Sequence, residues 1–138
     1  NTVASQANTI ASQANTIGSH TTSIAALQNS QTYIASNIQT GASYTISLND
    51  AGLIIDRNAT VNNTTIIPTN VSVGFQIGTV LSISNIGTGT STISATTGVT
   101  LNGVLGGSCV ISGRYKGASL RKISTDEWIV DGSVGAVA

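Results

Sequence analysis

The chain has 138 residues, of which only 7% are charged, with five Lys and Arg against five Asp and Glu. This balance gives no electrostatic reason to expect nucleic acid or an anionic membrane as a partner, and no run of about twenty apolar residues is present for membrane insertion. Met is absent and Gly is abundant, a composition more typical of a fibrous or all-β extracellular protein than of an enzyme.

A seven-residue repeat opens the chain. The segment ASQANTI occurs at residues 4–10 and again at residues 11–17, and a degenerate third copy ends at Ile24. A β-branched residue returns at multiples of seven, with one polar interruption at Gln31, and the series is Val3, Ile10, Ile17, Ile24 and Ile38. This spacing predicts a helix over residues 1–40 whose apolar stripe is covered by further chains in a coiled coil.

Two heptad phases fit this stripe. If the Ile series occupies position d, position a holds Ala7, Ala14, Thr21, Gln28 and Ala35. If it occupies position a, position d holds Gln6, Gln13, His20, Leu27 and Ile34. We favour the second phase because it brings Leu27 and Ile34 into the seam. The predicted coiled-coil seam is then Val3, Ile10, Ile17, Ile24, Leu27, Ile34 and Ile38.

Gln6, Gln13 and His20 would form polar layers inside this seam. Three imidazoles on a symmetry axis can hold an ion, whereas polar seam residues are best attested as hydrated layers that fix the register of a coiled coil. We favour the hydrated layers. No cluster with the local spacing of metal ligands is present, so neither a metal nor a cofactor is predicted.

The predicted helix has little stability of its own. Asn, Thr, Ser and Gly fill its outer positions, and the first 43 residues contain no Lys, Arg, Asp or Glu. Association must therefore stabilise it. Because the repeat is already in register at residue 1, we expect the chain to be a fragment or processed form of a longer protein.

After Gly41, which is expected to end the helix, the periodicity changes from seven to two. Short strands are predicted at residues 44–48, 53–56, 64–67, 80–86, 90–95, 99–101, 109–112, 118–124 and 127–131. Gly87, Thr88 and Gly89 suggest a hairpin between residues 80–86 and 90–95, and Thr125 and Asp126 turn the last pair. Residues 42–138 are therefore predicted to form one small sandwich or barrel, a head domain after a stalk of residues 1–40.

The sequence argues against catalysis. His20 lies in the predicted helix, far in sequence from Cys109, and a nucleophilic triad would need a histidine beside its nucleophile. The carboxylates available for a glycosidase pair are Asp50, Asp56, Asp126, Glu127 and Asp131. Turn chemistry already explains Asp50 and Asp126, so we predict that the protein is not an enzyme. Cys109 is the only cysteine, is expected in the core, and is compatible with folding in a reducing cytoplasm.

Several short segments together resemble the carboxy-terminal head module of tailed-bacteriophage fibre and appendage proteins. The segments are YTISL from Tyr44 with DAG from Asp50, IIP from Ile66, GFQIGT from Gly74, NIGTG from Asn85, GVTLN from Gly98 and GASLRKISTDEWIVDG from Gly117. The resemblance covers nearly all of residues 42–133. It implies a homotrimer in which a small β-sandwich or jelly-roll-like head follows a coiled-coil stalk on the surface of a virion.

The resemblance leads to two functional expectations. The first is a trimeric tail fibre that is folded in the host cytoplasm, joins other virion proteins through an amino-terminal part outside this chain, and assists attachment to host surface polysaccharide. The second is a fibre that decorates the capsid and has a mainly structural role. Multivalent binding would let a weak single head give useful avidity.

Arg114, Tyr115 and Lys116 are the predicted contacts with host glycans. They lie on a Gly-bounded loop and combine an aromatic plane with two cations. Arg121 and Lys122 extend this basic group in the sequence. Trp128, in an alternating strand nearby, is predicted to be a core or interface anchor rather than a sugar contact.

Overall fold

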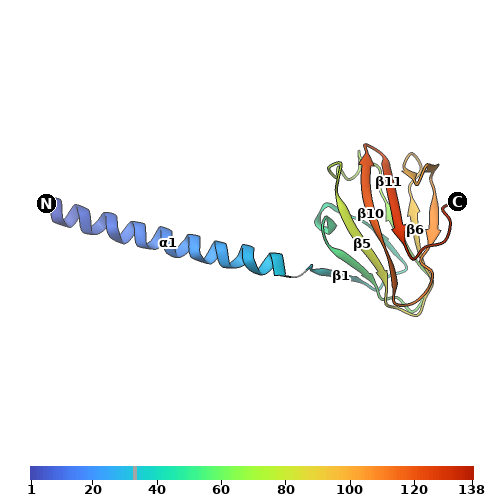
Figure 1. Ribbon diagram of the computed structural model, residues 1–138, viewed down its shortest axis with the longest axis horizontal. Helices are drawn as coiled ribbons and strands as arrows, with labels where there is room; N and C mark the ends of the chain where they lie inside the picture. Colours follow the sequence, from blue (N-terminus) through green and yellow to red (C-terminus); the bar gives the residue numbers. More distant parts are fainter. Residues whose placement is uncertain (33) are drawn as a thin grey trace. The chain divides into compact units, whose positions relative to one another are not determined.

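The computed structural model describes residues 1–32 and 34–138 (Figure 1). The chain forms two compact units, Asn1–Ile34 and Ala35–Ala138. Its elements are α1 (Thr2–Thr32), β1 (Ser36–Gln39), β2 (Ser43–Thr45), the 3-10 helix η1 (Leu48–Asp50), β3 (Ile54–Arg57), β4 (Asn63–Ile67), β5 (Val80–Asn85), β6 (Ser91–Ala95), β7 (Thr100–Leu101), β8 (Val104–Leu105), β9 (Ser108–Val110), β10 (Lys116–Ser124) and β11 (Glu127–Gly132).

The helix α1 is a single 31-residue element. Its hydroxyl side chains bond backward to the carbonyl four residues earlier, as from Thr9 to Ser5 and from Thr16 to Ser12, both at 3.0 Å. These bonds satisfy the hydroxyl groups without a tertiary partner. The predicted apolar stripe is open in the single chain, with exposed fractions between 55% and 72% at Val3, Ile10, Ile17, Ile24 and Leu27. Among the described residues, no helix combines the length and hydropathy needed to cross a membrane.

The helix ends earlier than the heptad pattern predicts. Ile38, assigned to the seam, lies instead in β1, where it pairs with Asp56 of the parallel strand β3. Ile34 also lies beyond α1. Gly41 does not end the helix, because it lies between β1 and β2. A β-branched residue such as Ile38 suits a strand as well as a helix. Residues 36–39 form a strand and not a further turn of helix because they hydrogen-bond to β3 at the edge of the sheet.

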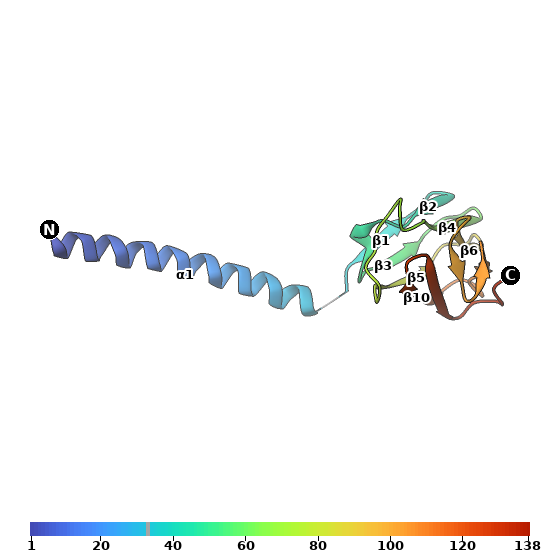
Figure 2. The ribbon, with the colours of Figure 1, turned by 90° about the horizontal axis from the view of Figure 1, so that it is seen from above.

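The second unit is mainly β, as predicted, and is built from two mixed sheets. The larger sheet has the strand order β1, β3, β5, β10, β11, β7, β8, and the smaller one has the order β2, β4, β6, β9. Figure 2 shows β2, β4 and β6 in one layer and β1, β3, β5 and β10 in the other. The first six strands alternate between the sheets, so the chain winds as a coil whose successive turns stack in parallel. Jelly rolls are antiparallel, so this strand order differs from the expected one.

The hairpin predicted around Gly87, Thr88 and Gly89 is wrong. β5 lies in the larger sheet and β6 in the smaller one, and the glycine segment carries the chain across the corner between them. A Cβ atom on Gly87 would lie 2.2 Å from the Ala59 carbonyl oxygen, and one on Gly89 would lie 1.9 Å from that of Val61. The absence of a side chain at Gly87 and Gly89 therefore lets this corner pack directly on the backbone of the earlier corner at Ala59 and Val61.

The last two long strands lie in the middle of the larger sheet, between β5 and β7. β10 pairs antiparallel with β5 on one side and with β11 on the other, and the predicted turn at Thr125 and Asp126 joins β10 to β11. In Figure 1, β5, β10 and β11 lie side by side. The parallel coil thus ends against an antiparallel hairpin.

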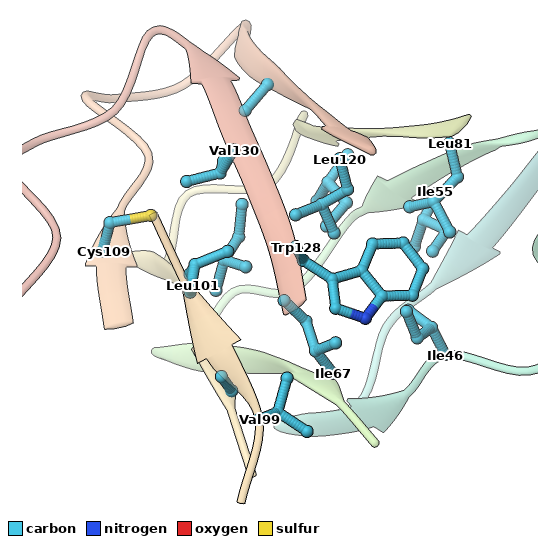
Figure 3. Packing of buried hydrophobic residues seen from close by; sticks show 14 of the residues in the cluster. Ile46, Ile55, Ile67, Leu81, Val99, Leu101, Cys109, Leu120, Trp128 and Val130 are labelled. Carbon is cyan, nitrogen blue, oxygen red and sulfur yellow. The ribbon is translucent and has the colours of Figure 1, made fainter. Parts of the chain in front are cut away.

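Apolar side chains from both sheets fill the space between them. Trp128 is 1% exposed and meets Phe75 edge to face, with 5.4 Å between ring centroids. Figure 3 shows its indole among Ile46, Ile55 and Ile67. The core position predicted for Trp128 is confirmed, and so is that of Cys109, which is 3% exposed.

Candidate ligand-binding site

The loop between β9 and β10 holds Tyr115 in an uncommon backbone conformation. Its φ of +60° is in the left-handed region, which a bulky non-glycine residue seldom adopts. The backbone N–H of Tyr115 donates a 2.6 Å hydrogen bond to the carbonyl of Asn85, at the end of β5. The tertiary structure therefore holds this conformation in place, and the aromatic side chain is 71% exposed. Strain of this kind concentrates at functional sites.

Arg114 is held from two sides. Its Nε donates a 3.0 Å hydrogen bond to the carbonyl of Ile86, and its guanidinium carbon lies 4.6 Å from the centre of the Tyr115 ring. The described residues provide no further hydrogen-bond partner for the guanidinium group. Its two Nη groups are consequently available to a ligand, and the guanidinium group makes a cation–π contact with the Tyr115 ring.

Lys116 begins β10 and pairs across the sheet with Asn85. The structure thus brings all three predicted glycan contacts to one exposed segment beside the end of β5, with Arg114 and Tyr115 on the loop and Lys116 at the first position of β10. The sequence alone did not show that this loop adjoins the corner between β5 and β6.

A depression of about 290 Å³ lies next to Arg114. It is formed by the corner after β5, the end of β9 and the loop after β9. Its lining residues are Asn85, Thr88, Gly89, Thr90, Val110, Ile111, Ser112, Gly113 and Arg114. The lining contains one charged side chain, Arg114, and no carboxylate.

Asn85 connects the depression to the interior. The residue is 2% exposed, and its Nδ2 donates a 3.0 Å hydrogen bond to the carbonyl of Gly89. Its Oδ1 has no hydrogen-bond partner among the described residues. Asn85 was not among the predicted site residues. The only signal was its place before the Gly87 turn, which was interpreted as a hairpin.

The basic surface suggested by the sequence is smaller than expected. Lys122 is 2% exposed, and its Nζ donates hydrogen bonds to the Phe75 carbonyl, at 2.8 Å, and to Asn70. This ammonium group also lies 6.0 Å from the centre of the Trp128 ring. Lys122 is therefore a buried structural cation. Arg121 is exposed at the other end of β10, opposite Val80.

Arg57 is a second buried cation and was not among the predicted site residues, although it adjoins the half-buried Asp56 in the sequence. Strand alternation sends them to opposite faces. Arg57 Nε donates to Asn63 Oδ1 at 3.0 Å, and Nη2 donates to the Gly41 carbonyl at 2.7 Å. Burial lowers the pKa of Arg57.

Three of the five carboxylates already accept hydrogen bonds. Asp50, 1% exposed, accepts from Asn37 Nδ2 at 2.6 Å, Tyr44 Oη at 2.7 Å and the Ser47 N–H at 2.7 Å. Asp126 accepts from the N–H of Asn70 at 2.6 Å. Asp56 accepts from the hydroxyls of Ser36 and Ser84, whereas Glu127 is half-buried and Asp131 is exposed. Asp126 lies in the predicted turn, but its carboxylate bonds to a backbone N–H 56 residues away and not to its own turn. Asp50 makes one local backbone bond, to Ser47, and its other partners include the side chains of Asn37 and Tyr44.

The predicted polar layers lie on the open surface of the single helix. Gln6, Gln13 and His20 are exposed, and shallow grooves along α1 run beside Ile10 and Ile17. The described part of the chain contains no group of three His, Cys, Asp or Glu side chains that could hold a metal ion.

Neither a family model nor a curated protein matches this chain.

Proposed function

We propose that the chain is the subunit of a homotrimeric bacteriophage fibre. Its helices form a parallel coiled-coil stalk, and its β domain is a head that assists attachment of the virion to the bacterial surface. This role requires no catalysis. The alternative is that the same trimeric fibre decorates the capsid and has a mainly structural role.

The observation that carries the proposal is the open apolar stripe of α1. Val3, Ile10 and Ile17 are each at least 64% exposed in the single chain, on a helix without Lys, Arg, Asp or Glu. An isolated helix of this composition has little stability in water. An apolar stripe with a seven-residue period packs well against the same stripe on another copy of the chain. Burying each Ile in such a seam contributes about 1.5–3 kcal/mol.

The uncharged outer positions of α1 favour association with copies of the same chain rather than with a different helix. Without flanking charges, interhelical ion pairs cannot select another chain. The number of three copies, and the place on a virion, come from the resemblance of residues 42–133 to phage fibre heads. The position of Ile38 in β1 shortens the proposed stalk to the extent of α1.

The exposed loop at Arg114, Tyr115 and Lys116 supports a role in surface contact. The left-handed backbone of Tyr115 is strained, and strain of this kind concentrates at functional sites. Three such loops on one fibre would bind a repetitive polysaccharide with avidity.

Light scattering on the full chain tests the assembly. The expected mass is three times the 13.9 kDa of one chain. A monomer at micromolar concentration would overturn the proposal. Immunogold labelling of phage particles with antibodies against the chain then separates the two positions, because label at the tail supports attachment and label over the capsid supports decoration.

A further inference from the structure

We propose that the depression beside Arg114 binds one acidic sugar unit, with the sugar carboxylate on the Arg114 guanidinium. This inference rests on the proposed contact with host polysaccharide and deepens it by naming the class of ligand.

The charge of the site selects an anion. Arg114 is the one ionised side chain in the lining, and its two Nη groups have no hydrogen-bond partner in residues 1–32 and 34–138. A guanidinium fork matches a carboxylate through two parallel N–H bonds. The bond to Ile86 and the stacking on Tyr115 fix the fork before a ligand arrives, which lowers the entropic cost of binding.

The rest of the lining suits a hydroxylated ligand. The exposed side chains of Thr88, Thr90 and Ser112 carry hydroxyl groups that can donate and accept hydrogen bonds. A ligand with several hydroxyls and one carboxylate, such as a uronic acid, matches this set of groups.

The size of the depression limits the ligand to a single unit. Its volume of about 290 Å³ lies just below the range for small-molecule sites, which begins at roughly 300 Å³. Neighbouring units of a polysaccharide would extend along the exposed loop, where Tyr115 and Lys116 lie. The binding of one unit is expected to be weak.

Saturation-transfer NMR on the full chain tests the inference, at 150 mM salt to screen diffuse attraction. The probes are methyl glucuronide, the neutral methyl glucoside, and glycerol phosphate as an anion of different chemistry. We expect transfer to the glucuronide and about tenfold weaker binding of the glucoside, because a charge-assisted bond is lost.

Each of two variants removes one exposed positive charge. Arg114→Gln removes it from the depression, and Arg121→Gln removes it elsewhere on β10 as the matched control. Arg114→Gln is expected to weaken glucuronide binding by about tenfold, whereas Arg121→Gln leaves it unchanged. The intrinsic fluorescence of Trp128 reports whether each variant is folded. Equal binding of the glucoside, equal weakening by both variants, binding of glycerol phosphate alone, or no binding of any probe would each overturn the inference.

The outcome is separable from that of the proposed function. A trimer that ignores methyl glucuronide keeps the fibre and loses the acidic-sugar site. A monomer that binds methyl glucuronide in an Arg114-dependent way keeps the site and loses the fibre.

Discussion

The phenol of Tyr44 donates a 2.7 Å hydrogen bond to the buried carboxylate of Asp50. Asn37 and Ser47 donate to the same carboxylate, so one side chain joins β1, β2 and η1 at the start of the parallel coil. The first turn of the coil has no earlier turn to pair with. The Asp50 network therefore holds the exposed end of the stack.

Asp50→Ala is expected to destabilise the β domain by about 3 kcal/mol, because it leaves three half-buried donors without their shared acceptor. Urea unfolding followed by the fluorescence of Trp128, the single tryptophan, measures the loss. Asp131→Ala removes an exposed carboxylate from β11 and serves as the control. If the two variants unfolded at the same urea concentration, the role given to Asp50 would be wrong.

Tyr44 should make the domain sensitive to alkaline pH. Burial, and then the bond to Asp50, raise the pKa of Tyr44. The folded state therefore holds the phenol proton more tightly than the unfolded chain does. The stabilisation is complete below the unfolded pKa of about 10 and is lost as the pH rises through the raised folded pKa.

Tyr44→Phe is expected to remove this part of the alkaline loss. Burial also raises the pKa of Cys109, which gives a loss of the same sign, so both proteins are compared in a Cys109→Ala background. The measurement is the urea midpoint at pH 8 and pH 11. The same decrease with and without the Tyr44 hydroxyl would argue against this linkage.

Gly89→Ala is expected to destabilise the domain by about 3 kcal/mol, since its Cβ would overlap the backbone of the corner beneath it. The predicted contact is 1.9 Å from the Val61 carbonyl oxygen. Gly74→Ala is the matched control, because its Cβ would meet the Asn70 carbonyl at an ordinary 3.6 Å. Thermal unfolding by circular dichroism compares them, and equal midpoints would contradict the stacked corner.

The Cys109 thiol is expected to be inert in the folded protein. It is 3% exposed, and burial raises its pKa, so little thiolate is present to react. Labelling with a thiol reagent at pH 8 should be at least about a hundredfold slower without urea than with it. Rapid labelling of the native chain would place Cys109 outside the core.

The helix seam is tested by Ile17→Ser, with Asn15→Ser on the opposite side of the same helix as control. In the favoured heptad phase, Ile17 is position a and Asn15 is position f. Ile17→Ser is expected to weaken association by about tenfold for each chain in the trimer. Sedimentation across a concentration series measures it, and identical behaviour of the two variants would show that the stripe is not an interface.

The location of most elements followed from local pattern. A seven-residue period indicates a helix, alternation indicates a strand, and both patterns operate over a few neighbouring residues. The strands around Thr65, Ile83 and Trp128 lie where alternation placed them, and the inward face of Trp128 followed from the same alternation. The loop at Arg114, Tyr115 and Lys116 was recognised from its bounding glycines.

Strand pairing could not be read in this way. Gly87, Thr88 and Gly89 suit a hairpin and a corner between two sheets equally well, and only contact with Ala59 and Val61 selects the corner. Ile38 suits a helix stripe and a sheet edge equally well, and pairing with β3 selects the edge.

Local periodicity is enough to predict a repeated helix with an apolar stripe and a β-rich remainder, because it acts between neighbours along the chain. The burial of Arg57 and Lys122, the three elements joined by Asp50, and the depression shared by Asn85 and Arg114 appear only in the folded domain. Several of these facts depend on distant partners, such as Asn37, 13 residues from Asp50, and Asn70, 52 residues from Lys122. Such residues become neighbours only when the whole domain folds.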